Sequence, residues 1–158
     1  MAAAETEQPA APERPRVDPW LPCVLAWLLP GLGHWALGRR RRAVVFLVVV
    51  LAMFVLGLSA QGASALVDRT QPLTYLEVFD NLAMGPLDLV GRYLTYGRIV
   101  YALPGDESDP ARAPLTERLR ERIRSVTFEY GNAYLLTAGL MNMLLVLDAF
   151  DIASGRKD

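Results

Sequence analysis

The sequence predicts an all-α membrane protein with three transmembrane helices: a hairpin of two spans, then amphipathic interfacial helices, then a C-terminal span. Residues 20–37 contain no acidic residue, lysine or arginine, and residues 43–67 contain no charged residue at all. Residues 132–152 carry their first charge only at Asp148. Because about 18 or more uncharged residues in a row indicate a helix in lipid, each stretch is expected to cross a membrane.

The chain of 158 residues is long enough for one domain with four parts. A disordered tail at 1–18, rich in Ala, Glu and Pro, precedes a transmembrane hairpin at 19–67. An interfacial helical region follows at 68–130, and residues 131–158 form the third span with a short basic tail. The net charge of −1 argues against a nucleic-acid partner, since phosphate binding needs concentrated positive charge.

The first predicted span, residues 20–37, is interrupted by Pro30 and nearby glycines. Proline lacks a backbone N–H, so a kink is expected, and a neighbouring helix must satisfy the freed carbonyls. We therefore expect tight packing against the second span, residues 43–60. The turn that joins the two spans is short and basic and consists of Arg39, Arg40, Arg41 and Arg42.

The third predicted span places small residues on one helix face. These residues recur at helical spacing and are Gly131, Ala138, Asn142, Ala149 and Ala153. Small side chains let two helix backbones approach closely, which favours association in lipid, and Asn142 is placed to hydrogen-bond across such an interface. Chance spacing in an alanine-rich protein is the alternative interpretation.

Amphipathic helices are expected between the second and third spans. A short helix at 76–84 precedes one at 86–101, which starts at proline and carries Asp88 and Arg92 at i,i+4. Tyrosines cluster in this region, so the second helix is placed flat on the membrane surface or capping the bundle. After a linker at 104–114, a charged helix at 115–126 presents either a solvated face or a contact with anionic lipid.

The basic turn sets the predicted orientation, because positive charge beside a span stays in the cytoplasm. With three spans, the N-terminus then lies outside, and the C-terminus, with Arg156 and Lys157, lies in the cytoplasm. Arginines within 118–124 lie outside in this arrangement. Charges in an intervening segment longer than about sixty residues have little influence on orientation.

Asp148 and Asp151 stand near the cytoplasmic end of the third predicted span. An intramembrane carboxylate is costly and indicates a function by default. Three interpretations are open. Asp148, with or without Asp151, pairs with arginines of the basic turn and locks the third helix to the hairpin; the carboxylates simply reach the interface; or Asp148 and His34 form a proton or cation path.

His34 has no neighbouring His or Cys residues that would make it a metal ligand, and no suitably spaced nucleophile that would make it catalytic. A hydrogen-bonded structural histidine is therefore the expected role. The sequence contains no phosphate-binding loop, dinucleotide fingerprint or HExxH motif. We accordingly predict neither an enzyme activity nor a cofactor.

The stretch LAWLLPGLGHWALGR, residues 25–39, resembles the two-helix membrane hairpin called the TM-2 domain. The matching positions are Gly31, Gly33, His34, Leu37 and Gly38. Trp35-Ala36 stands where two aromatics are usual, and Pro30 is extra. Segments 123–132 and 144–157 resemble an uncharacterised bacterial family of small membrane proteins. This resemblance implies a multi-pass protein of the bacterial inner membrane and supplies no catalytic residues.

The predicted role is a non-enzymatic structural or accessory subunit that packs against itself or against a larger membrane complex. The alternative is a small transporter or channel component that uses Asp148, Asn142 and His34. The predicted partners are the lipid bilayer and either further copies of the chain or other membrane proteins.

Overall fold

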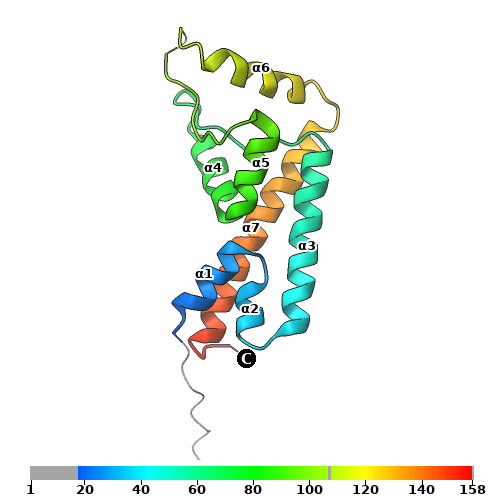
Figure 1. The fold of residues 1–158 in the computed structure, drawn as a ribbon, viewed down its shortest axis with the longest axis vertical. Coiled ribbons are helices and arrows are strands. Elements are labelled where there is room, and N and C mark those ends of the chain that lie inside the picture. Colours follow the sequence, from blue (N-terminus) through cyan, green and yellow to red (C-terminus); the bar gives the residue numbers. More distant parts are fainter. Residues whose placement is uncertain (1–17, 107, 158) are drawn as a thin grey trace, which may run out of the picture.

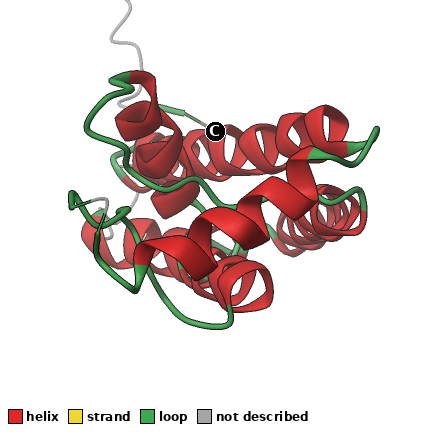
Figure 2. Ribbon diagram, turned by 90° about the horizontal axis from the view of Figure 1, so that it is seen from above, coloured by secondary structure: helices red, strands yellow, loops and turns green. Residues whose placement is uncertain are grey.

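The computed structural model describes residues 18–106 and 108–157, which form seven helices and their connecting loops (Figures 1 and 2). Within these residues there is no named strand, only two isolated backbone bridges. The prediction of an all-α fold is therefore confirmed. The predicted tail at 1–18 lies outside the described residues except for Asp18 and stays a prediction.

Two long helices, α3 (Arg40–Ser59) and α7 (Phe128–Ala153), pack side by side along the molecule (Figure 1). Both are long and apolar enough to cross a membrane. At a rise of about 1.5 Å per residue, α3 reaches about 30 Å, the thickness of a bilayer core. The small-residue stripe predicted for the third span is buried on α7. Helices α1, α3 and α4 of the same chain cover α7, so the stripe packs within the chain.

The first predicted span is not a continuous helix. It forms α1 (Trp20–Leu28) and the short α2 (Leu32–Ala36). Leu29 is extended, at φ −145° and ψ 123°, because a following proline disfavours the helical conformation. Gly31 then adopts a left-handed φ of 86° beside Ala43, whose carbonyl oxygen would lie 2.3 Å from a Cβ at this glycine. The chain consequently reverses, and α2 returns to the end of the bundle where α3 begins (Figure 1).

This reversal bears on the predicted number of spans. Only α3 and α7 qualify as spanning helices within the described residues, so the expectation of three spans is not confirmed. The nine residues of α1 reach only about 14 Å. The start of α1, the start of α3 and the end of α7 lie at one end of the molecule (Figure 1). The predicted placement of the N-terminus opposite the C-terminus stays a prediction.

A second helical hairpin occupies the other half of the bundle. It consists of α4 (Leu73–Ala83) and α5 (Pro86–Tyr96), joined by a turn at Gly85, whose φ is 62°. Its tip meets the tip of the first hairpin, where the Trp27 indole Nε1 donates a 2.9 Å hydrogen bond to the Leu82 carbonyl. Together α1 and α4 are about 30 Å long at the helical rise. Two half-length pieces thus take the place of a third continuous helix beside α7 (Figure 1).

Both hairpin helices differ from the predicted amphipathic helices in position and bounds. The segment expected at 86–101 ends at Tyr96, where Gly97 caps the helix with a left-handed φ of 72°. It runs along the bundle rather than across its end (Figure 1). The helix that does lie across the end is α6 (Arg112–Ile123), which starts three residues earlier than the predicted 115–126 (Figure 2).

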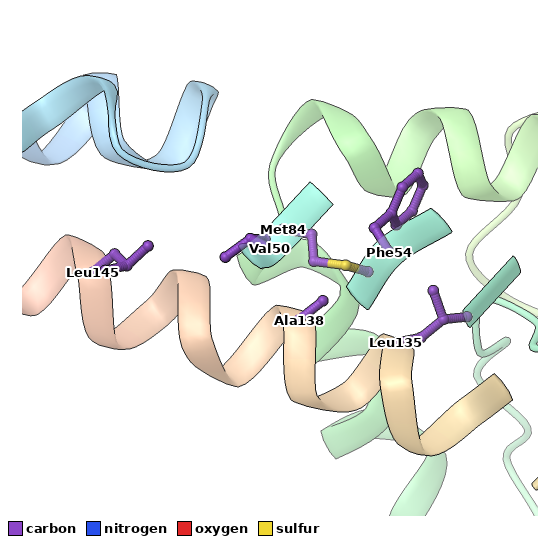
Figure 3. Packing of buried hydrophobic residues seen from close by; sticks show 6 residues of the cluster. All are labelled: Val50, Phe54, Met84, Leu135, Ala138 and Leu145. Atoms are coloured by element: carbon purple, nitrogen blue, oxygen red, sulfur yellow. The ribbon is translucent and has the colours of Figure 1, made fainter. Parts of the chain in front are cut away.

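The main core lies between α3, α7 and the tip of the second hairpin (Figure 3). Its buried members are Val50, Phe54, Met84, Leu135, Ala138 and Leu145. Met84 is fully buried although it follows directly after α4. The core therefore fixes the depth to which the second hairpin enters the bundle.

Candidate functional site

The buried histidine of the first hairpin contacts the last part of α7. His34 has no exposed surface, and its Nε2 lies 2.9 Å from Oδ2 of Asp148. The ring also packs edge-on against Phe46 of α3, at 4.9 Å between centroids. The other carboxylate oxygen, Oδ1, accepts a hydrogen bond from Lys157. His34 therefore joins α2 to both long helices, as expected for a hydrogen-bonded structural histidine.

The basic turn does not pair with the α7 carboxylates as predicted. Arg39 precedes α3 and the other three arginines form its first turn. In the part of the chain that the structure describes, the ion-pair partners of Asp148 are His34 and Lys157, and Asp151 pairs with Arg156 at 3.8 Å. The physical reason is that α2 packs against α7 and brings His34 to Asp148, whereas Arg40 stacks 5.7 Å from the centroid of the Trp35 ring.

A second group of buried polar residues lies where α4 crosses α7. Asn142 is fully buried and donates a 2.8 Å hydrogen bond from Nδ2 to the Ala83 carbonyl, while its own Oδ1 has no partner among residues 18–106 and 108–157. Asn142 thus contacts the second hairpin of its own chain. Asp80 packs against Gly139, which lies about one helical turn before Asn142 on α7. A Cβ atom at Gly139 would lie 2.5 Å from the Asp80 carboxylate oxygen Oδ2.

Asp80 is the most unusual residue of this group. It is buried, and neither of its carboxylate oxygens has a hydrogen-bond partner among the described residues. A buried charge normally needs a partner, a bound cation or a proton. Asp80 and Asn142 therefore present unsatisfied oxygen atoms to the contact between α4 and α7. Such a contact has the chemistry to hold a proton, a water molecule or a small cation.

The polar face of α5 points inward. Asp88 and Arg92 are fully buried and pair at 2.7 Å, which confirms the predicted i,i+4 contact but not its predicted exposure. Arg92 Nη1 also donates to the carbonyls of Ala65 at 2.9 Å and Val100 at 2.6 Å, and its guanidinium lies 3.9 Å from the Tyr101 ring centroid. These bonds tie the second hairpin to the loops around it.

The apolar face of α5 points outward. Its exposed large side chains are Leu89, Val90, Tyr93 and Leu94, at 40%, 48%, 63% and 58% exposure. This polarity is the reverse of that of a helix on a water-soluble protein, whose apolar stripe faces the core. Helix α4 shows the same pattern, with Leu73, Leu76 and Phe79 exposed and Asp80 buried.

Sequence reasoning did not identify Asp80, Asp88 and Arg92 as site residues. The i,i+4 spacing of Asp88 and Arg92 predicts that they pair, but it does not indicate that the pair is buried. No local signal distinguished Asp80, because its burial depends on Gly139, which is distant in sequence. In the described residues, no three His, Cys, Asp or Glu side chains lie close enough together to hold a metal ion.

A family model described as a family of unknown function, DUF6677, matches residues 21–158. No curated protein and no solved structure matches the chain. The matched region contains both half-length hairpins, both long helices and all the polar contacts described above. The expectation of an uncharacterised family is thereby confirmed, while the TM-2 resemblance and the bacterial origin stay predictions. The chain belongs to the DUF6677 family of unknown function.

Proposed function

We propose that this protein is a small integral membrane protein and a non-enzymatic accessory subunit of a membrane assembly. The observation that carries the proposal is the reversed polarity of the second hairpin, with ionisable side chains inside and large apolar side chains outside. Burial of apolar surface is the main favourable term in water, so this surface would be costly there. In lipid the same surface is fully solvated.

The two hairpins fit this environment as re-entrant elements. A helix of about 14 Å ends in the middle of a bilayer core of about 30 Å, where its last carbonyls need partners inside the protein. The contact between Trp27 and the Leu82 carbonyl supplies such a partner. We therefore place the tips of α1 and α4 near the bilayer centre, with α6 at one membrane surface.

This placement gives a new orientation. The arginines at the start of α3 stay on the cytoplasmic side of a bacterial inner membrane, following the positive-inside rule. Because α1 and α2 enter and leave at the same end, the beginning of α1 is cytoplasmic as well. The proposed orientation keeps the C-terminal end of α7 in the cytoplasm and α6 outside.

Native mass spectrometry of the tagged protein in mild detergent tests the accessory role. We expect either an oligomer or a complex with a co-purified membrane protein, because the exposed sides of α3, α5 and α7 are broad apolar surfaces. A strict monomer in every mild detergent, with no co-purified protein, would contradict an accessory role. A chain that stays dispersed without detergent would contradict the membrane location itself.

A second candidate function is a proton or cation transport component. It is favoured by one observation: the unpaired Asp80 and Asn142 oxygens lie beside the junction of two interrupted helices. In transporters, ion sites near the bilayer centre are commonly built from such discontinuous helices. The same interior also contains the His34–Asp148 pair, nearer the cytoplasmic end.

Proteoliposome flux measurements test this second function. Asp80→Asn should abolish a proton or cation flux while the protein stays folded, whereas Asp106→Asn, at an exposed loop position, should leave it unchanged. Absence of any flux from the unchanged protein would contradict the transport function and leave the accessory role standing.

A further inference from the structure

A polar cavity of about 470 Å³ lies where α6 crosses the ends of α3 and α5. Its lining residues are Gln61, Thr95, Arg118, Glu121 and Arg122. No apolar side chain lines it, in contrast to the core and to the outer surface of α5. Two arginines against one glutamate leave an excess of positive charge, so the cavity favours an anion.

Arg122 is held in place by backbone carbonyls. Its Nη1 donates to the Gly62 carbonyl at 2.7 Å and its Nη2 to the Leu94 carbonyl at 3.4 Å. Burial lowers the pKa of this guanidinium, and the nearby Tyr96 opposes that shift. A partly desolvated, fixed guanidinium attracts an anion more strongly than a freely hydrated one.

Two further donors of the cavity are unpaired within the described residues. The Arg118 guanidinium stands over Gly97, where a Cβ would lie 3.0 Å from Nη1, and it forms no ion pair or hydrogen bond there. The Thr95 hydroxyl is buried and also lacks a partner. Buried polar groups are normally satisfied, so the unpaired hydroxyl is an independent indication that a polar ligand belongs here.

The surroundings of the cavity indicate an amphiphilic ligand. Leu94 gives its carbonyl oxygen to Arg122 while its side chain is exposed on the outer face of α5. The apolar outer face of α5 therefore leads directly to the arginines. A phosphate bound to the guanidinium groups would have room for acyl chains along this face, and basic pockets at helix ends bind anionic headgroups in this way.

We propose that the cavity between α6 and the ends of α3 and α5 binds the phosphate of an anionic phospholipid. Arg118 and Arg122 bind the phosphate oxygens, the Thr95 hydroxyl donates a further hydrogen bond, and the acyl chains lie against α5. The assignment rests on the proposed membrane location. A bound phospholipid would also account for the position of the arginine-rich helix α6 at the end of the bundle.

Native mass spectrometry with added lipid tests the site on the full chain in detergent. Phosphatidylglycerol should bind more tightly than phosphatidylcholine to the unchanged protein. Arg118→Gln should weaken phosphatidylglycerol binding about tenfold, the loss expected for one charge-assisted contact. Arg124→Gln is the matched control, because Arg124 is exposed, lies next to α6, and does not line the cavity.

Arg118 is the preferred position because it makes no bond that the fold needs, whereas Arg122→Gln also removes two bonds to backbone carbonyls. Equal phosphatidylglycerol binding by Arg118→Gln and Arg124→Gln would overturn the site. Inorganic phosphate that binds as tightly as phosphatidylglycerol would overturn the lipid source of the phosphate. A protein that stays dispersed without detergent would instead contradict the membrane location. Failure of the lipid site and failure of the membrane location are therefore distinguishable.

Discussion

The Trp27 indole donates a 2.9 Å hydrogen bond to the Leu82 carbonyl and thereby joins two hairpins that enter the bundle from opposite ends. Leu82 lies in the last turn of α4, and its carbonyl also accepts a 3.0 Å hydrogen bond from the Gly85 N–H in the turn. The contact therefore adds a bond across the junction of α1 and α4, the two short helices that lie beside α7.

Removal of this hydrogen bond should lower stability. Trp27→Phe removes one of the hydrogen bonds to the Leu82 carbonyl, which keeps its 3.0 Å bond from the Gly85 N–H. The expected cost is about 0.5–1.5 kcal/mol in the free energy of unfolding, measured in mixed detergent micelles. Trp20→Phe is the control, because Trp20 is 72% exposed and its ring makes no hydrogen bond in the described part of the chain. Equal stability losses in both variants would show that the bond is unimportant.

Two glycines with positive φ differ in what a side chain would meet. At Gly85, with φ 62°, a Cβ would lie 2.1 Å from the Trp27 carbonyl oxygen, whereas at Gly38, with φ 78°, a Cβ would meet no atom within 4 Å. Gly38→Ala should cost about 1–2 kcal/mol of unfolding free energy, from backbone strain alone. Gly85→Ala should cost clearly more, because its ψ of −135° adds backbone strain and the two hairpin tips must separate. Similar thermal stabilities for the two variants would contradict the close contact of the tips.

The contact between His34 and Asp148 should behave as a coupled pair. A double-mutant cycle with His34→Ala and Asp148→Ala is expected to give an interaction free energy of about 1–2 kcal/mol, since His34 is fully buried. The Asp151–Arg156 pair, at 3.8 Å and largely exposed, is the matched comparison and should give less than about 0.5 kcal/mol. The reverse order of the two energies would contradict the assignment of His34 as the link between α2 and α7.

Arg92 should not tolerate replacement by lysine. Arg92→Lys cannot keep the bonds to Asp88 and to the carbonyls of Ala65 and Val100 together, and an expected loss of about 2–4 kcal/mol follows. Arg98→Lys, at an exposed arginine with one bond to the Ala111 carbonyl, should change stability by less than about 1 kcal/mol. Thermal unfolding in one detergent compares the two, and a fully stable Arg92→Lys variant would contradict the buried network.

Several features were predictable from local pattern. The apolar length of α3 and α7, the small-residue face that contains Ala138 and Asn142, and the Asp88–Arg92 spacing all follow from helical periodicity. The first predicted span is not a continuous helix, although its eighteen uncharged residues suffice for a span by composition. Pro30 was interpreted as a kink, but with the left-handed Gly31 it reverses the chain.

The buried polar site was less accessible to sequence reasoning. Whether a polar stripe faces water or the protein interior depends on what surrounds the helix, and in lipid the usual rule is inverted. The burial of Asp80 depends on α7, and that of Arg92 depends on the loops at Ala65 and Val100, so neither follows from local pattern. The partner of Asp148 was equally non-local, because it depends on the reversal at Gly31 that brings His34 to the end of α7.

Chemical labelling of single cysteines in intact cells tests the central claim most directly. In a Cys23→Ala background, cysteines are introduced singly at Asp18, Ser108 and Arg156 and exposed to a membrane-impermeant maleimide. The proposed re-entrant arrangement of α1 and α4 predicts that the cysteine at Ser108 reacts from outside, whereas those at Asp18 and Arg156 react only after the membrane is permeabilised. Reaction of the Asp18 cysteine from outside, together with that at Ser108, would require a first helix that crosses the membrane and would contradict the re-entrant arrangement.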